Sequence, residues 1–186
     1  MRLNTPGDGW GEAMAEVGLG LLALAGGRIQ ESAGHFARGV EIAEAGQDVF
    51  TRVVAGNNVA RVMLIGGDIE SAEGEYGTTL SLSARLHYDE GAQYAFEGLS
   101  AIAAVRGDGW RAGALAVAAA VVRQRIGVFD VEGFAAHVQP LATLRASDPE
   151  GVAAGERAGA AMSIAEAVAI ALPDASRTLQ EALAEW

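Results

Sequence analysis

Apolar residues recur at steps of three and four along the first part of the chain. Trp10, Met14, Val17, Leu21 and Leu24 follow this spacing, which places them on one face of a helix. Two glycines follow at 26–27 and predict the end of that helix. A second stripe over 28–45 predicts a second helix, which a polar turn at 46–48 ends.

This pattern occurs twice more, each time with a shift of forty residues. Gly27 falls on Gly67 and then on Gly107, and the residues around it stay small or apolar. The matching sets are Leu19, Val59 and Leu99; Leu22, Val62 and Ile102; Ala23, Met63 and Ala103; Ala25, Ile65 and Val105. A fixed period of this length indicates stacked helix pairs, because one pair cannot bury its apolar face alone. We divide the chain into a lead-in (1–8) and three copies (9–48, 49–88 and 89–128).

The period is lost after 128, and the rest of the chain reads as a helical C-terminal cap over 131–186 that packs on the last copy. We expect a helix over 130–146, a second over 149–161 and a third up to 172. A last helix is expected from 173 to the end. Asp148 followed by Pro149 is a helix start, and Ser163 with Glu166 forms a capping box.

A strip of glycines marks the second of these helices. Gly151, Gly155 and Gly159 recur every four residues and leave a smooth face on which another helix can pack closely. The same glycines lower helix propensity, each by roughly 0.5–1 kcal/mol relative to alanine, so a marginal helix is the alternative.

Charge and composition narrow the function classes. The 186 residues hold 24 acidic and 13 basic side chains, all of the latter arginine, for a net charge of −11. No arginine cluster suited to phosphates occurs, so we expect no direct nucleic-acid partner. Cysteine is absent, and no apolar run reaches the roughly 20 residues of a membrane span. We expect a soluble cytoplasmic protein with no membrane association.

No residue pattern points to an enzyme. His35, His87 and His137 lack a second ligand at the short helical spacing of metal motifs, and no Gly-x-Ser-x-Gly elbow occurs. We therefore expect no catalytic residues, no metal and no cofactor.

Within each copy the spacing is similar to that of the tetratricopeptide repeat (TPR). Leu19-Gly20, Ala23, Gly27, Ile29 and Phe36 occupy the positions of its small, apolar and aromatic residues. Val59-Ala60, Met63, Gly67, Ile69, Ala72 and Tyr76 do so in the second copy, whereas the third departs at Gly109 and Ala116. The period of forty exceeds the usual 34. The resemblance implies an all-α, right-handed superhelix, a TPR-like solenoid of three helix pairs with a helical cap.

A narrower resemblance covers 96–108 and 162–172. These runs resemble the C-terminal helical-repeat region of large bacterial regulators, the signal-transduction ATPases and LuxR-type transcriptional regulators. In that family the repeats form a sensing and protein-binding arm beside a nucleotide-binding module. This chain has no lysine and hence no phosphate-binding loop of the Gly-x-x-x-x-Gly-Lys type. The resemblance implies that it is the arm alone, as a fragment or as a stand-alone relative.

In such a solenoid the first helix of each pair lines the concave surface. We expect a ligand-binding groove formed by Asn57, Arg61, Tyr94 and Glu97, whose side chains suit a peptide backbone or a carboxylate. The alternative is structural: Arg61 and Glu97 pair with each other across adjacent helices. If the groove binds a ligand, we expect a protein or peptide as the partner and no catalytic role.

The first copy presents an apolar set in the same register. Met14, Val17, Leu21 and Leu24 predict a face that another element covers: a missing upstream helix, the C-terminal helix or a second copy in a homodimer. A second function remains open at this stage. The same groove can close into an apolar pocket, which would make the chain a small-molecule sensor.

Overall fold

The computed structural model describes residues 8–127 and 138–173, and the elements within these ranges are all helices. Nine helices are present in this part of the chain. They are α1 (Asp8–Ala25), α2 (Ile29–Ala45), α3 (Val49–Ile65), α4 (Ile69–Leu86), α5 (Asp89–Val105), α6 (Gly109–Ile126), α7 (Val138–Ser147), α8 (Pro149–Gly159) and α9 (Ile164–Ala171). The predicted all-α class is confirmed. The segments predicted as helical at 130–137 and after 173 lie outside the described residues.

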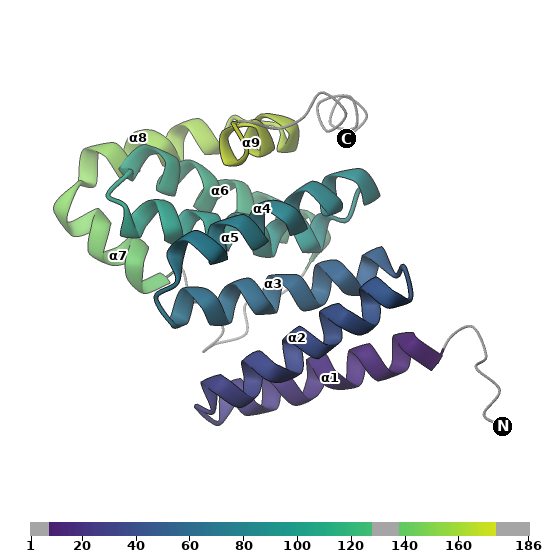
Figure 1. Cartoon of the computed structure of the whole chain (residues 1–186). Helices are drawn as coiled ribbons and strands as arrows, with labels where there is room; N and C mark the ends of the chain where they lie inside the picture. The colour runs from purple at the N-terminus through teal and green to yellow at the C-terminus, as the bar shows by residue number, and fades with distance from the viewer. Residues whose placement is uncertain (1–7, 128–137, 174–186) are drawn as a thin grey trace, which may run out of the picture.

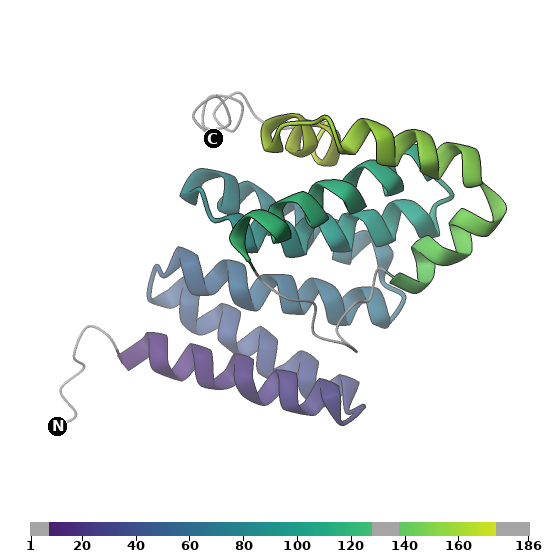
Figure 2. The same ribbon diagram turned by 180° about the vertical axis from the view of Figure 1, so that it is seen from behind.

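The helices follow one another through space in chain order up to α6. Each of them packs on the next, and α1 also contacts α3, while α3 contacts α5. The α1–α2 pair lies at one end of the molecule and α8 with α9 at the other, as both views show (Figures 1 and 2). After α6 the order changes, because α7 packs on α5 and α8 packs along α6.

The turns that join the helices from α1 to α6 share one geometry, which recurs every twenty residues. At the first turn the Arg28 amide donates to the Ala23 carbonyl at 2.9 Å, and the Gly27 amide donates to Leu24 at 3.0 Å. These two hydrogen bonds form a Schellman motif, which satisfies carbonyls that the helix end leaves without partners. The residue in the middle has a left-handed backbone each time, with φ from 51 to 83°. The residues are Gly27, Gln47, Gly67, His87, Gly107 and Gly127.

Aspartates begin several of the helices. The Asp68 carboxylate accepts a hydrogen bond from the Ser71 amide at 3.2 Å, and Asp148 does the same from Gly151 at 3.0 Å. The predicted capping box is also present, since Ser163 and Glu166 each accept the other's backbone N–H. Asp48 and Asp108 cap α3 and α6 in the same manner. These caps help fix where α3, α4, α6, α8 and α9 begin, whereas α2 and α5 begin without a side-chain cap.

Burial at equivalent positions rises along the stack. Leu22 is 67% exposed in α1, Val62 is 6% exposed in α3 and Ile102 is 1% exposed in α5. Leu19 and Leu99 differ in the same direction, at 47% and 1%. The cause is position: α3 and α5 each have an earlier helix pair against them, whereas α1 has none among the described residues.

The predicted cover face of α1 needs correction. Val17 is only 3% exposed and belongs to the core shared with Phe36 of α2 and Val62 of α3. Leu21 and Leu24 pack against this same core, and Met14 is half-buried. The periodicity identified a true apolar stripe, but α2 and α3 already cover most of it, so it is not the free surface of the helix.

The glycine strip of α8 lies directly on α6. A Cβ atom at Gly155 would overlap the backbone oxygen of Trp110, and one at Gly159 would overlap that of Ala114. From the other side, a Cβ at Gly113 would overlap the Val152 oxygen. Helix α8 therefore forms despite its glycines and uses them for close backbone contact with α6.

Candidate functional site

The four residues predicted to line the groove come from α3 and α5, and the structure separates them into two groups. Asn57 and Glu97 are buried, at 7% and 8% exposed. Arg61 is half-buried and Tyr94 is 38% exposed. Only the second group therefore reaches the surface.

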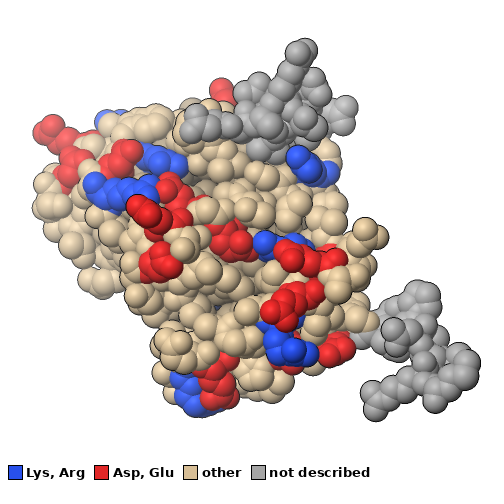
Figure 3. All heavy atoms as spheres, viewed as in Figure 1, with Lys and Arg blue, Asp and Glu red and all other residues tan. Residues whose placement is uncertain are grey.

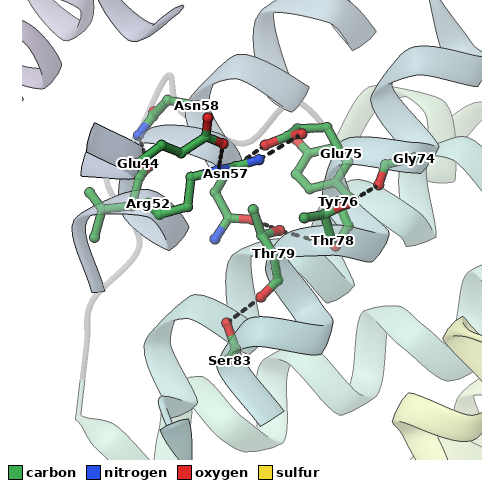
Figure 4. A network of polar contacts seen from close by, with 11 residues as sticks. Glu44, Arg52, Asn57, Asn58, Gly74, Glu75, Tyr76, Thr78, Thr79 and Ser83 are labelled. Carbon is green, nitrogen blue, oxygen red and sulfur yellow. Dashed lines mark hydrogen bonds and ion pairs between the residues drawn. The ribbon is translucent and has the colours of Figure 1, made fainter. Parts of the chain in front are cut away.

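Asn57 holds three helices together. Its Nδ2 donates to the Gly91 carbonyl of α5 at 3.0 Å, and its Oδ1 accepts a hydrogen bond from the Thr79 hydroxyl of α4 at 2.7 Å (Figure 4). Both ends of the amide are thus satisfied inside the protein. Asn57 was predicted to line the groove, but its position on α3 faces the following helix pair instead of solvent.

Glu97 is likewise part of the interior. Its carboxylate accepts a hydrogen bond from Gln93 Nε2 at 2.6 Å and forms an ion pair with Arg123 of α6. Because Glu97 is buried and paired with Arg123, its side chain does not line an exposed groove. An ion pair was foreseen as the structural alternative, but with Arg61 of α3 as the partner. The pair seen here joins α5 to the helix that follows it.

Arg61 and Tyr94 are close enough to affect each other electrostatically. Burial lowers the pKa of the Arg61 guanidinium, and the charge interactions with Tyr76 and Tyr94 oppose this lowering. Tyr76 is buried in the core below, where burial raises its pKa. The structure therefore brings together two of the four predicted residues, with Tyr94 as the more exposed member.

Two further aromatic residues extend this site. Phe50, in the first turn of α3, is 45% exposed, and its ring centroid lies 4.8 Å from that of Tyr88. Tyr88 precedes α5 and donates a hydrogen bond to Glu90 at 3.3 Å. Burial raises its pKa, as do Glu90 and the neighbouring Tyr94.

We call Phe50, Tyr88, Tyr94 and Arg61 the α3–α5 aromatic surface. Sequence reasoning missed Phe50 and Tyr88. A signal for Phe50 was present, since it lies forty residues after Trp10, which is also exposed, at 58%. Tyr88 gave no such signal, because it occupies the turn before α5, where the repeat has no aromatic position.

A charged network lies between α2, α3 and α4. Arg52 forms ion pairs with Glu44 at 2.8 Å and with Glu75 at 2.6 Å, and its side chain is 13% exposed (Figure 4). Burial lowers the pKa of Arg52, but Glu75 and Glu44 outweigh it and raise the pKa overall. Red and blue side chains lie next to one another over this face (Figure 3). The network links successive helices.

The described residues contain no group of three His, Cys, Asp or Glu side chains placed to hold a metal ion. His35 lies 2.7 Å from a carboxylate oxygen of Glu16 on α1, and His87 is the left-handed residue of the fourth turn. His137 lies outside the described residues.

An open hollow of about 390 Å³ lies between the end of α5 and α7. It shares no residue with the α3–α5 aromatic surface. Its walls are mostly aliphatic with a few hydroxyl and amide groups. The residues are Ala104, Val105, Gln139, Pro140, Thr143, Leu144 and Ser147.

Two further findings concern the chain as a whole. Among the described helices, none combines the length and apolar character that crossing a membrane requires. No protein-family model matches the sequence, and neither the curated proteins nor the solved structures provide a significant match.

Proposed function

We propose that this chain is a non-catalytic module that binds a protein or peptide segment on the α3–α5 aromatic surface. In this proposal the helix pairs form a right-handed, TPR-like superhelix. The module acts as the sensing or regulatory arm of a bacterial transcriptional regulator or signal-transduction ATPase. The repeat spacing and the resemblance of 96–108 and 162–172 support the regulatory part.

The observation that carries the proposal is the exposure of aromatic rings beside a cation. Phe50 is 45% and Tyr94 is 38% exposed, and Arg61 lies next to Tyr94. Tyrosine, tryptophan and arginine dominate the binding energy of protein interfaces, because they supply large contact areas together with hydrogen-bond donors. Helices α3 and α5 hold these side chains in place, so little conformational entropy is lost when a partner binds.

The chemistry of the surface defines the ligand class. Aromatic rings accept an aliphatic or aromatic side chain, and the positive charge of the Arg61 guanidinium attracts a carboxylate. With a net charge of −11, the chain repels nucleic-acid phosphates. We infer a peptide segment that carries an apolar anchor with an acidic residue nearby.

A small-molecule sensor is the second candidate, because of the hollow between α5 and α7. Its volume of about 390 Å³ is within the size range of ligand pockets. It is open on one side, and the described residues of its wall carry no charge. The hollow therefore suits a small apolar ligand, which it would bind weakly.

Selection of peptides from a random display library, followed by titration calorimetry, tests the main proposal. The Tyr94→Ala variant should weaken binding of the selected peptides about tenfold, or about 1.4 kcal/mol, as expected for an interface anchor. Phe50→Ala should act in the same direction. Trp110→Ala is the matched control, because Trp110 is similarly exposed, at 42%, but lies on α6.

Two results would contradict the proposal. The first is that peptides bind wild type, Tyr94→Ala and Phe50→Ala equally well. The second is that only small apolar molecules raise the melting temperature and that Leu144→Arg, in the hollow, abolishes this effect. The second result would support the sensor instead.

A further inference from the structure

Helix α1 carries a strip of small and apolar residues that faces away from the other described helices. We call it the α1 outer face; it consists of Gly11, Ala15, Gly18, Leu19 and Leu22. Leu19 and Leu22 are 47% and 67% exposed. A Cβ atom added at Gly11 or Gly18 would meet nothing within 4 Å. The five side chains carry no charge.

The equivalent faces of the later copies are covered. In α3 the matching residues Thr51 and Ala55 are fully buried, and Val62 lies in the core with Val17 and Phe36 of the preceding pair. In α5 the matching face is buried along its whole length. Its residues are Gly91, Ala95, Gly98, Leu99 and Ile102.

The contrast is clearest at one glycine. A Cβ atom at Gly98 would collide with the ring of Tyr76 from the preceding pair, whereas the equivalent Gly18 has open space. The α1 outer face thus has the composition of a surface that a helix covers elsewhere in this chain. An exposed apolar patch of this kind marks an interface.

The face is complementary to itself. Its small residues, Gly11 and Ala15, lie toward the start of α1, and its bulky residues, Leu19 and Leu22, lie toward the end. In an antiparallel pair of α1 helices, Leu22 of each copy lies over Gly11 of the other, and Ala15 lies opposite Gly18. A parallel pair would instead place leucine against leucine and leave a gap at the glycines. Self-complementarity is the condition for a two-fold interface.

We propose that two copies of the chain associate through their α1 outer faces, with the two α1 helices antiparallel. A head-to-tail stack is disfavoured, because α8 already covers α6 at the other end through direct backbone contact. The proposal is independent of peptide binding, since it shares no residue with the α3–α5 aromatic surface.

Salt should strengthen this association. Each copy carries a net charge of −11, so two copies repel each other, while the contact itself is apolar. Added salt screens the repulsion over a Debye length of about 10 Å at 0.1 M and leaves the apolar contact in place. An interface built on ion pairs would respond in the opposite direction.

Sedimentation equilibrium of the full chain tests the proposal. Wild type should reach twice the monomer mass, and more readily at higher salt. Leu22→Arg should raise the dissociation constant by more than about tenfold, because the dimer would bury an unpaired charge. Leu86→Arg is the matched control: Leu86 is 43% exposed on α4, and this variant should associate as wild type does. Circular dichroism should show that both variants keep the helix content of wild type.

A wild-type chain that stays monomeric at high concentration and high salt would overturn the proposal. So would a Leu22→Arg variant that dimerises like wild type.

A cysteine pair tests the antiparallel register, and the absence of native cysteine makes the result unambiguous. A chain with both Gly11→Cys and Leu22→Cys should form a covalent dimer under mild oxidation, whereas either single variant should not. Efficient cross-linking of the Leu22→Cys variant alone would overturn the antiparallel arrangement in favour of a parallel one.

Discussion

The two ends of the described helix stack differ in whether another helix covers them. At one end α8 lies on α6 so closely that glycines of each helix contact the backbone of the other. At the other end the α1 outer face has two exposed leucines and no neighbour among the described residues. The α1–α2 and α5–α6 turns share the same hydrogen bonds, so the difference does not lie in the turns of the helix pairs themselves.

This difference shows that a few residues determine how closely a further helix can pack at the end of the stack. Gly113, Gly155 and Gly159 close one end because they let two backbones approach. At the other end Leu22 is 67% exposed, although its counterpart Ile102 is an ordinary core residue at 1% exposed. The same position in the repeat is thus core or surface depending on what lies before it.

The largest expected effect comes from truncating equivalent positions in α5 and α1. Ile102→Ala should destabilise the protein by about 3 kcal/mol, because it leaves a cavity in a packed core. Leu22→Ala, at the equivalent but exposed position, should change stability by less than about 0.5 kcal/mol in dilute solution. Urea unfolding followed by circular dichroism measures both. Equal costs would show that the open end is covered in the single chain.

The second test inserts a methyl group at each end. Gly155→Ala should destabilise by about 2 kcal/mol, since it forces α8 away from the backbone of α6. Gly18→Ala makes the same change where nothing lies within 4 Å, and should stabilise α1 by about 0.5–1 kcal/mol through helix propensity. Thermal unfolding at low protein concentration compares the two. Opposite signs are the expected outcome, and a stabilising Gly155→Ala would refute the close contact.

The smallest effect concerns the turns, which the two ends share. Gly67→Ala should cost about 1 kcal/mol, because a left-handed backbone is unfavourable for a residue with a Cβ atom. Gln47→Gly should stabilise the protein by less than about 1 kcal/mol. Gln47 has φ of 54°, and glycine adopts this left-handed backbone without the clash of a Cβ atom. Chemical denaturation measures both changes. No change in either variant would argue against the shared turn geometry.

Most of the helices could be predicted from the sequence. Steps of three and four located α1, and the glycines at 27, 67 and 107 located the turns. The forty-residue period concealed a twenty-residue one, because Gln47 and His87 occupy the left-handed position in every second turn. Neither residue type marks such a turn, so the shorter period required the backbone angles.

The site was predicted only in part, and burial is the reason. Asn57 and Glu97 are polar residues whose helical positions resemble exposed ones, yet each finds its partners inside the protein. The amide of Asn57 needs the Gly91 carbonyl, thirty-four residues away, which no local pattern reveals. Of the four predicted residues, Arg61 and Tyr94 are the two that lie where α3 and α5 reach the surface, and their role in binding stays a prediction.

The turn geometry limits how such a chain can lengthen during evolution. Every turn from α1 to α6 reverses the path after about the same number of residues, so gaining a single helix would send all later helices in the opposite direction. Gaining two helices would restore the original direction, and the later helices would keep the same neighbours as before. Duplication of whole hairpins is therefore the growth step that keeps existing contacts, and relatives of this protein should differ in length by multiples of two helices.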